Sequence, residues 1–241
     1  ISAVFFFLAA YTYLRYSDKI YDTSAKIQII DKKQSSLELP TASELFSKSK
    51  INLENEIEVI KSYPILSQVV ENKKLHTSVI SIGNIRQSLT IDYPFKISLN
   101  LPVDSLSKST YRLNIAAEGF EIIDKNNDSK KYAFKGVSTY NVKHNLPFEI
   151  FDFDRQQYIN DYNEGYEIHF SSVSQMVASF KRSIEIFQVG KESDIIELEF
   201  KSTNSDYSEI VLNELIHVFN NDGIQDRQLI HKRTIDFVNE R

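Results

Sequence analysis

The stretch NEIEVIKSYPILSQVVENKKL, residues 55–75, predicts two short helices that meet at a hinge. Asn52 can cap the first helix, whose opening turn carries two glutamates, the charge that a helix N-terminus favours. Ser62 can cap the second helix, because Pro64 then falls in the first turn, where its missing N–H costs little. The apolar stripe of this second helix is expected to be Ile65, Leu66, Val69 and Val70. The segment is well organised and yet carries no catalytic signature.

Composition excludes several classes of protein. With 241 residues, 41% of them hydrophobic, the chain can bury one large core or two modest ones. Its net charge of −5, with both signs interspersed, offers no broad cationic surface for nucleic acid. The absence of cysteine rules out disulfides and thiolate metal sites.

The first residues, ISAVFFFLAAYTYL, run without a charge as far as Arg15. As a helix this run would be about 21 Å long, against about 30 Å for the hydrocarbon core of a bilayer. Tyr11, Tyr13 and Tyr16 follow where an interfacial aromatic belt would lie, so we expect residues 1–17 to be the C-terminal part of a first transmembrane helix. A buried core helix or a signal-peptide remnant is the alternative.

Residues 18–222 are expected to form one α/β domain. Residues 21–31 alternate as a half-buried strand does, residues 32–50 look like an exposed loop, and short β-like segments fill residues 89–170. A helix is predicted near 173–183, followed by a hairpin and a terminal helix that Gly223 interrupts, with residues 223–241 beginning an extended helical arm. The predicted fold class is α+β: a mixed, mostly antiparallel sheet packed with helices, next to a membrane, with a transmembrane remnant first and a long helix last.

A search for chemistry finds no strong motif. The sequence has no phosphate-binding loop, no HExxH and no GxSxG, and its five histidines show no metal-ligand spacing, so we predict no catalytic, cofactor or metal site. His169 lies beside Glu167 on the polar side of a predicted strand, where a solvated or structurally bonded imidazole is the simpler interpretation. Asp152 and Asp154 could mark a cation site or a glycosidase pair, but alternate acidic residues on a strand usually form a solvated face.

The order of these segments resembles the periplasmic domain of the Wzz-like chain-length determinants, the polysaccharide co-polymerases. The likeness rests on NEIEVIKS, on the hairpin IFQVGKESDIIELEF and on DYSEIVLNEL, and it extends over nearly all of residues 1–241. The branch fused to a cytoplasmic tyrosine autokinase is the most similar. A kinase module would lie beyond Arg241, so residues 1–241 are assigned no kinase activity. The residues that match the family's structural motif are Asn55, Glu56, Lys61, Ser62, Leu212 and Asn213.

The resemblance implies a periplasmic scaffold at the bacterial inner membrane that regulates the chain length or export of an exopolysaccharide or capsule. Its implied partners are further copies of itself, the polysaccharide polymerase and export machinery, the polysaccharide and the membrane, with no cofactor. Two alternatives stay open: a ligand-sensing domain of a membrane receptor kinase, and a membrane-anchored carbohydrate-active enzyme. For contacts with a neighbouring subunit or an acidic polymer we choose a polar surface of the terminal helix, with plain solvation as its alternative. It consists of Arg227, His231, Lys232 and Arg233.

Overall fold

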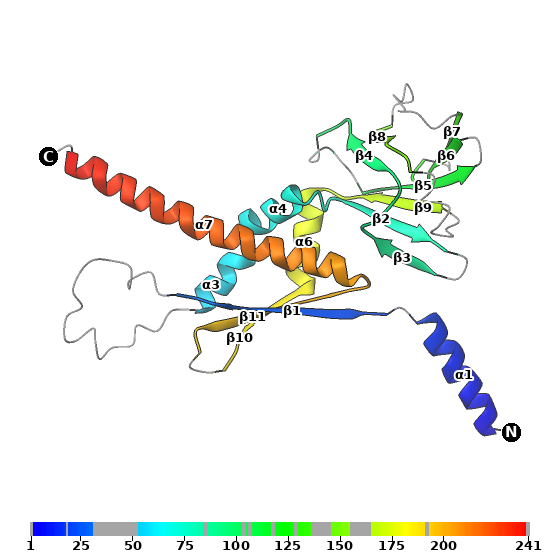
Figure 1. Cartoon of the computed structure of the whole chain (residues 1–241), viewed down its shortest axis with the longest axis horizontal. Helices are drawn as coiled ribbons and strands as arrows, with labels where there is room; N and C mark the ends of the chain where they lie inside the picture. Colours follow the sequence, from blue (N-terminus) through cyan, green and yellow to red (C-terminus); the bar gives the residue numbers. More distant parts are fainter. Residues whose placement is uncertain are drawn as a thin grey trace. The chain divides into compact units, whose positions relative to one another are not determined.

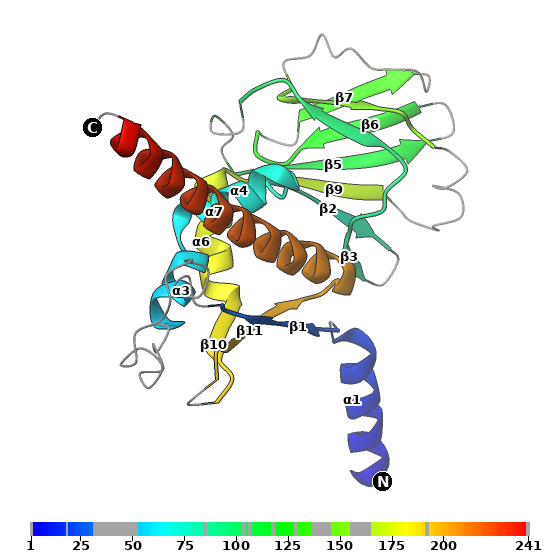
Figure 2. The ribbon, with the colours of Figure 1, turned by 60° about the vertical axis from the view of Figure 1, so that its left-hand side comes forward.

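The structure is a computed structural model. The part of the chain that it describes consists of β-strands in three sheets and five helices (Figures 1 and 2). The described residues are 2–17, 19–30, 53–83, 86–102, 105, 108–116, 119–127, 130–135, 146–154, 165–190 and 193–239. They divide into two compact units. Unit 1 holds residues 1–21, 70–176 and 202–207, and unit 2 holds residues 22–69, 177–201 and 208–241. The α+β class with antiparallel sheets is confirmed.

Unit 1 is built on a six-stranded sheet in the order β3-β2-β9-β5-β6-β7. Every pair of neighbours in it is antiparallel, as the sequence predicts. A two-stranded sheet of β4 and β8 accompanies it. The strands are β2 (Thr77–Ile82), β3 (Gln87–Thr90), β4 (Lys96–Leu99), β5 (Ser109–Ala116), β6 (Gly119–Asp124), β7 (Lys130–Lys135), β8 (Phe148–Phe151) and β9 (Gly165–Phe170).

An aromatic core joins the two sheets of unit 1. Phe148 of β8 lies 4.9 Å from Tyr111 of β5 and 5.0 Å from Phe170 of β9, measured between ring centroids. Phe95 makes an edge-to-face contact with Tyr166 at 5.2 Å. Rings at such distances and tilts combine burial of a large apolar area with favourable quadrupole contacts. The core face of the six-stranded sheet is therefore fixed by every second residue of β5 and β9.

Strand β2 was not predicted from the sequence. In TSVISI only Val79 and Ile82 are buried, and their spacing of three does not show the period of two that marks a half-buried strand. Its pairing with β9 and β3 makes it a strand, because both neighbours supply partners for its backbone. Long-range pairing overrides the weak local pattern here.

Unit 2 contains a three-stranded sheet in the order β1-β11-β10. The strand β1 (Tyr21–Gln28) alternates between exposed and half-buried residues, and β10 (Ile184–Gln188) and β11 (Ile195–Ser202) form the predicted antiparallel hairpin. Gly190 adopts a φ of 82° in the turn, a conformation that suits glycine. Phe180 of α6 (Val173–Ser183) packs edge-to-face on Phe200 of β11. The predicted helix at 173–183 is thus confirmed.

The two helices of the hinge are α3 (Leu53–Ile60) and α4 (Tyr63–Asn72). The carbonyl of Ser62 accepts the amide of Leu66 at 3.1 Å, which is the first hydrogen bond of α4, and Pro64 lies in its first turn. The predicted apolar stripe is core, because each of its residues is at most 1% exposed: Ile65, Leu66, Val69 and Val70. Asn52 and the segment 32–50 lie outside the described residues.

The last helix, α7 (Ser205–Asn239), runs for 35 residues without a break. Asn204 caps it, because its Oδ1 accepts the amide of Tyr207 at 2.9 Å while its Nδ2 donates to the carbonyl of Leu89 at 3.0 Å. The interruption predicted at Gly223 does not occur. A single glycine inside a helix costs only about 1 kcal/mol relative to alanine, too little to end a helix of this length.

The first helix, α1 (Ser2–Tyr16), has 15 residues and buries none of them. Phe5, Phe6 and Phe7 are 69–76% exposed. Among the described residues, no helix combines the length and the apolar character needed to cross a membrane.

Candidate functional site: the polar face of the six-stranded sheet

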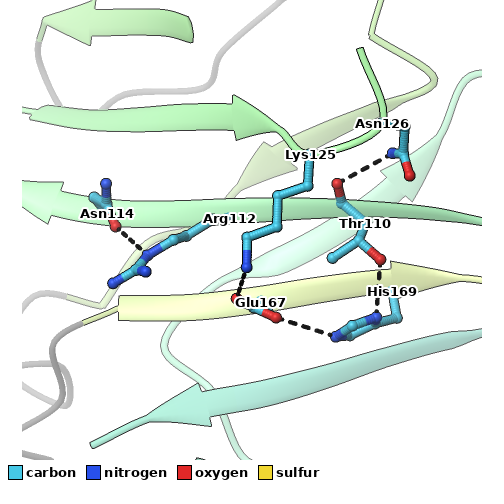
Figure 3. A network of polar contacts seen from close by, with 7 residues as sticks. All are labelled: Thr110, Arg112, Asn114, Lys125, Asn126, Glu167 and His169. Carbon is cyan, nitrogen blue, oxygen red and sulfur yellow. Dashed lines mark hydrogen bonds and ion pairs between the residues drawn. The ribbon is translucent and has the colours of Figure 1, made fainter. Parts of the chain in front are cut away.

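Polar side chains occupy the side of the six-stranded sheet opposite its aromatic core (Figure 3). They alternate with core residues along β5 and β9, and the register places Thr110 opposite His169 and Arg112 opposite Glu167. We call this surface the polar face. It consists of Thr110, Arg112, Asn114, Glu121, Lys125, Lys131, Glu167 and His169.

Glu167 is the most deeply buried charged residue of the polar face, with a side chain only 8% exposed. One of its carboxylate oxygens, Oε1, forms an ion pair with Nζ of Lys125, as Figure 3 shows. A buried carboxylate without a partner would cost several kcal/mol, so Lys125, which is 42% exposed, is what permits Glu167 to lie here. This pair links the end of β6 to the centre of the sheet.

His169 lies between Glu167 and Thr110. Its Nδ1 is 3.1 Å from Oγ1 of Thr110, and its Nε2 is 3.5 Å from Oε2 of Glu167, which is too long for a strong hydrogen bond. Burial is the main cause that lowers the pKa of His169; Lys125 and Lys108 lower it further, and Glu167 opposes them. His169 is therefore neutral at neutral pH, as the sequence-based interpretation of a structurally bonded imidazole expects.

A second chain of contacts begins at Arg112. Its Nε donates to Oδ1 of Asn114 at 3.0 Å, and Nδ2 of Asn114 donates to Oε2 of Glu121 at 3.3 Å. The other oxygen of Glu121 lies 3.7 Å from Nζ of Lys131. Glu167 lies opposite Arg112 in the strand register, but Glu167 forms its ion pair with Lys125. The guanidinium of Arg112 is oriented along its own strand, toward Asn114 (Figure 3).

The carboxylates of the polar face are paired with lysines of the same face. Lys125 engages the carboxylate of Glu167, and Lys131 lies beside that of Glu121. Within the described part of the chain, no three or more His, Asp or Glu side chains gather where they could hold a metal ion. The side chains of the polar face thus hold one another in place through hydrogen bonds and ion pairs.

Comparison with known proteins finds a match in the N-terminal part of the sequence, away from the polar face. Residues 1–73 match the family model described as Wzz, chain length determinant protein. Residues 1–73 are Wzz-like. The predicted Wzz-like resemblance is thereby confirmed over residues 1–73, where it supports a general role in determining polysaccharide chain length. The likeness of the rest of the chain, and that to the autokinase branch, stays a prediction. None of the curated proteins matches the chain.

The Wzz-like match includes α1, β1 and α3 and extends through α4, whereas the polar face lies outside it. Four of the family-motif residues lie within the match. Asn55 is exposed and Glu56 half-buried on α3, and Lys61 and Ser62 are half-buried between the two helices. The other two lie on α7, where Leu212 is buried and Asn213 exposed. Their structural role in the family stays a prediction.

The polar surface chosen on the terminal helix also lies on α7. His231, Lys232 and Arg233 are exposed, and the side chain of Arg227 is outside the described set. These four residues and the polar face come from different elements, and the contacts predicted for the four stay a prediction.

The acidic pair Asp152 and Asp154 was predicted to lie on a strand, and this part of the prediction is wrong. Asp152 and Asp154 do not continue a strand, because β8 ends at Phe151 and Asp152 adopts a φ of 55°. Aspartate tolerates this left-handed conformation better than most residues. Asp152 is 62% exposed and pairs with Lys96 across β4 and β8 at 2.5 Å. It thus forms a surface ion pair.

Sequence reasoning noticed Glu167 and His169 but missed the rest of the polar face. A signal was present, because STYRLNIA places Thr110, Arg112 and Asn114 at every second position. The partner of Glu167 could not be found in this way, because Lys125 is 42 residues away and follows the end of its strand.

Proposed function

We propose that this chain is a periplasmic scaffold domain of an inner-membrane polysaccharide co-polymerase, which regulates the chain length or export of an exopolysaccharide or capsule. The observation that carries the proposal is the Wzz match over residues 1–73. Proteins of that family are generally associated with the inner membrane.

The surface of α1 supports the membrane part of the proposal. Its large apolar side chains are 62–76% exposed at Val4, Phe5, Phe6, Phe7 and Leu8. Contiguous apolar surface of this kind marks a protein or membrane contact. The end of the helix carries Arg15, whose Nη1 donates to the hydroxyl of Tyr11 at 3.2 Å, a pairing that suits the polar–apolar boundary of a bilayer.

Residues 1–241 act, on this proposal, through shape and association and not through catalysis. The partners would be further copies of the chain, the polysaccharide polymerase and the export machinery. Fusion to a cytoplasmic tyrosine autokinase stays a prediction from the sequence. A regulator of this type needs a rigid frame, which the aromatic core of unit 1 and the buried stripe of α4 supply.

The membrane anchor can be tested with a matched pair of substitutions in the full-length protein. Phe6→Asp places a charge on α1, which costs about 2.5–3.5 kcal/mol within a bilayer. Ile30→Asp makes a comparable change at a residue that is 73% exposed, against 71% for Phe6. We expect Phe6→Asp alone to lower the share of protein that resists a carbonate wash of isolated membranes. Equal retention of both variants would contradict the anchor.

The regulatory role is tested in cells that lack the gene. Complementation with the full-length protein should restore the length distribution of the polysaccharide, resolved on a gel, and Asp152→Ala or Asp154→Ala should restore it equally. An enzyme loses several orders of magnitude in rate when its acid or nucleophile is removed. If a single carboxylate variant with normal folding abolished the polymer, the scaffold would have to be replaced by an enzyme.

A further inference from the structure

Arg112 differs from the other cations of the polar face. Lys125 is neutralised by Glu167, and Lys131 lies beside Glu121. Arg112 makes its hydrogen bond through Nε, and among the described residues no acceptor lies within hydrogen-bond distance of its two Nη groups. The Nε contact fixes the plane of the guanidinium, because Asn114 is in turn held by Glu121. Within the described part of the chain, the two Nη groups therefore form a preoriented fork of N–H donors.

The charge of the polar face has the opposite sign to that of the chain. Arg112, Lys125 and Lys131 supply three positive charges, and Glu121 and Glu167 two negative ones, which leaves +1. The chain as a whole carries −5. The excess charge is that of Arg112, since each lysine has its own carboxylate. A ligand for this face is therefore expected to bring an anionic group to Arg112.

We propose that the polar face binds an acidic polysaccharide, with the guanidinium of Arg112 receiving a carboxylate of the sugar chain. The proposed function is used only to choose a sugar polymer among anionic ligands. The guanidinium fork matches a carboxylate with two parallel hydrogen bonds, which a lysine cannot provide.

The rest of the polar face fits an extended ligand. Neighbouring strands of a sheet lie about 4.8 Å apart, so Arg112 and Asn114 of β5 are two strands, roughly 10 Å, away from Lys131 of β7, which is the length of about two sugar rings. Glu167 and Lys125 neutralise each other and keep this part of the surface in place without competing for the anion. Asn114 and the flanking lysines can then meet hydroxyl groups beside the carboxylate.

Binding is measured on the full-length protein in detergent, by calorimetry with oligogalacturonate of defined length. Neutral dextran of similar length is the control for sugar without charge, and polyphosphate is the control for charge without sugar. We expect oligogalacturonate to bind and dextran not to bind, and the affinity to fall as ionic strength rises. Equal binding of dextran, or stronger binding of polyphosphate, would overturn the proposal.

The role of Arg112 is tested by two substitutions with a matched control. Arg112→Gln should weaken binding roughly 10- to 100-fold, the equivalent of a lost charge-assisted contact. Arg112→Lys keeps the charge without the fork and should give an intermediate loss. Arg182→Gln removes the same group from an exposed position on α6 and should bind as the unchanged protein does. Unchanged affinity in both Arg112 variants would overturn the proposal.

A substitution with the opposite effect makes the test independent of folding. Glu121→Gln removes a negative charge and keeps an oxygen that can accept the hydrogen bond from Asn114. It should raise the affinity for oligogalacturonate, whereas a damaged surface would lower it. Weaker binding by a Glu121→Gln variant of normal thermal stability would contradict the charge argument. Failure of these binding tests leaves the chain-length assay in cells unaffected, so the two proposals can fail separately.

Discussion

The two faces of the six-stranded sheet are made from the same strands and yet differ in what holds them. On the core face, Tyr166, Ile168 and Phe170 of β9 are fully buried against the aromatic cluster. On the polar face, Glu167 and His169 of the same strand depend on ion pairs and hydrogen bonds from β5 and β6. Burial of apolar area is worth more than such polar contacts. The core face should therefore fix stability, while the polar face is available for binding.

The largest expected effect comes from adjacent residues on opposite faces. Phe170→Ala should lower the free energy of unfolding by about 3–5 kcal/mol, because Phe170 is fully buried and contacts the rings of Tyr111 and Phe148. His169→Ala should cost about 1 kcal/mol, the value of a typical hydrogen bond. Urea unfolding of both variants measures the contrast, and equal losses would show that the two faces contribute alike.

A second substitution tests whether β9 tolerates a side chain at Gly165, on the side of the strand that carries the polar residues. Gly165 has a φ of 148°, and a Cβ added to it would lie 2.5 Å from the carbonyl oxygen of Leu113. Because the obstacle is backbone, β9 and β5 would have to separate, and we expect Gly165→Ala to cost about 1–3 kcal/mol. Gly190→Ala is a control with open space around its Cβ, although its φ of 82° adds strain there too. If Gly165→Ala unfolds at the same urea concentration as the unchanged protein, the close approach is not structural.

Lowering the pH should reduce the stability of unit 1, because two of its histidines have lowered pKa values. Burial lowers the pKa of His76, with Lys74 adding to the effect, and burial likewise lowers the pKa of His169. The unfolded chain, with histidine pKa values of about 6.5, then takes up protons first as the pH falls, so stability declines below about pH 6.5. The melting temperature followed from pH 8 to pH 5 shows this decline. It should become shallower in His76→Gln and in His169→Gln, and an unchanged slope in both would refute the assignment.

The smallest expected effect is that of Asp152→Ala. Its ion pair with Lys96 is exposed on both sides, and such pairs contribute about 0–1 kcal/mol. We expect a loss in the free energy of unfolding of about 1 kcal/mol or less, because the lost ion pair is exposed and alanine tolerates the left-handed conformation of residue 152 only somewhat less well than aspartate does. A loss as large as that of Phe170→Ala would show that charged contacts outside the core help to fix the fold.

Local patterns were sufficient for several elements. The hinge of α3 and α4 follows from a proline two positions after the predicted capping residue Ser62, and the β10–β11 hairpin follows from alternation on either side of a glycine. The helix α6 was predicted with its observed bounds, because its apolar residues recur at helical spacing along its whole length. The Wzz resemblance was also carried by such local patterns, and the family match confirms it for residues 1–73.

The sequence by itself therefore determined the type of most elements and the family resemblance, because helix caps, turns and hydrophobic spacing act over a few residues. Only the tertiary structure decided that β9 lies between β2 and β5, that β2 is a strand and that α7 continues through Gly223. It also decided the polar face, where Glu167 meets Lys125 from 42 residues away and His169 meets Thr110 from 59. Such contacts depend on which strands pair and in which register. That choice is made by burial of the opposite face, which no short stretch of sequence contains.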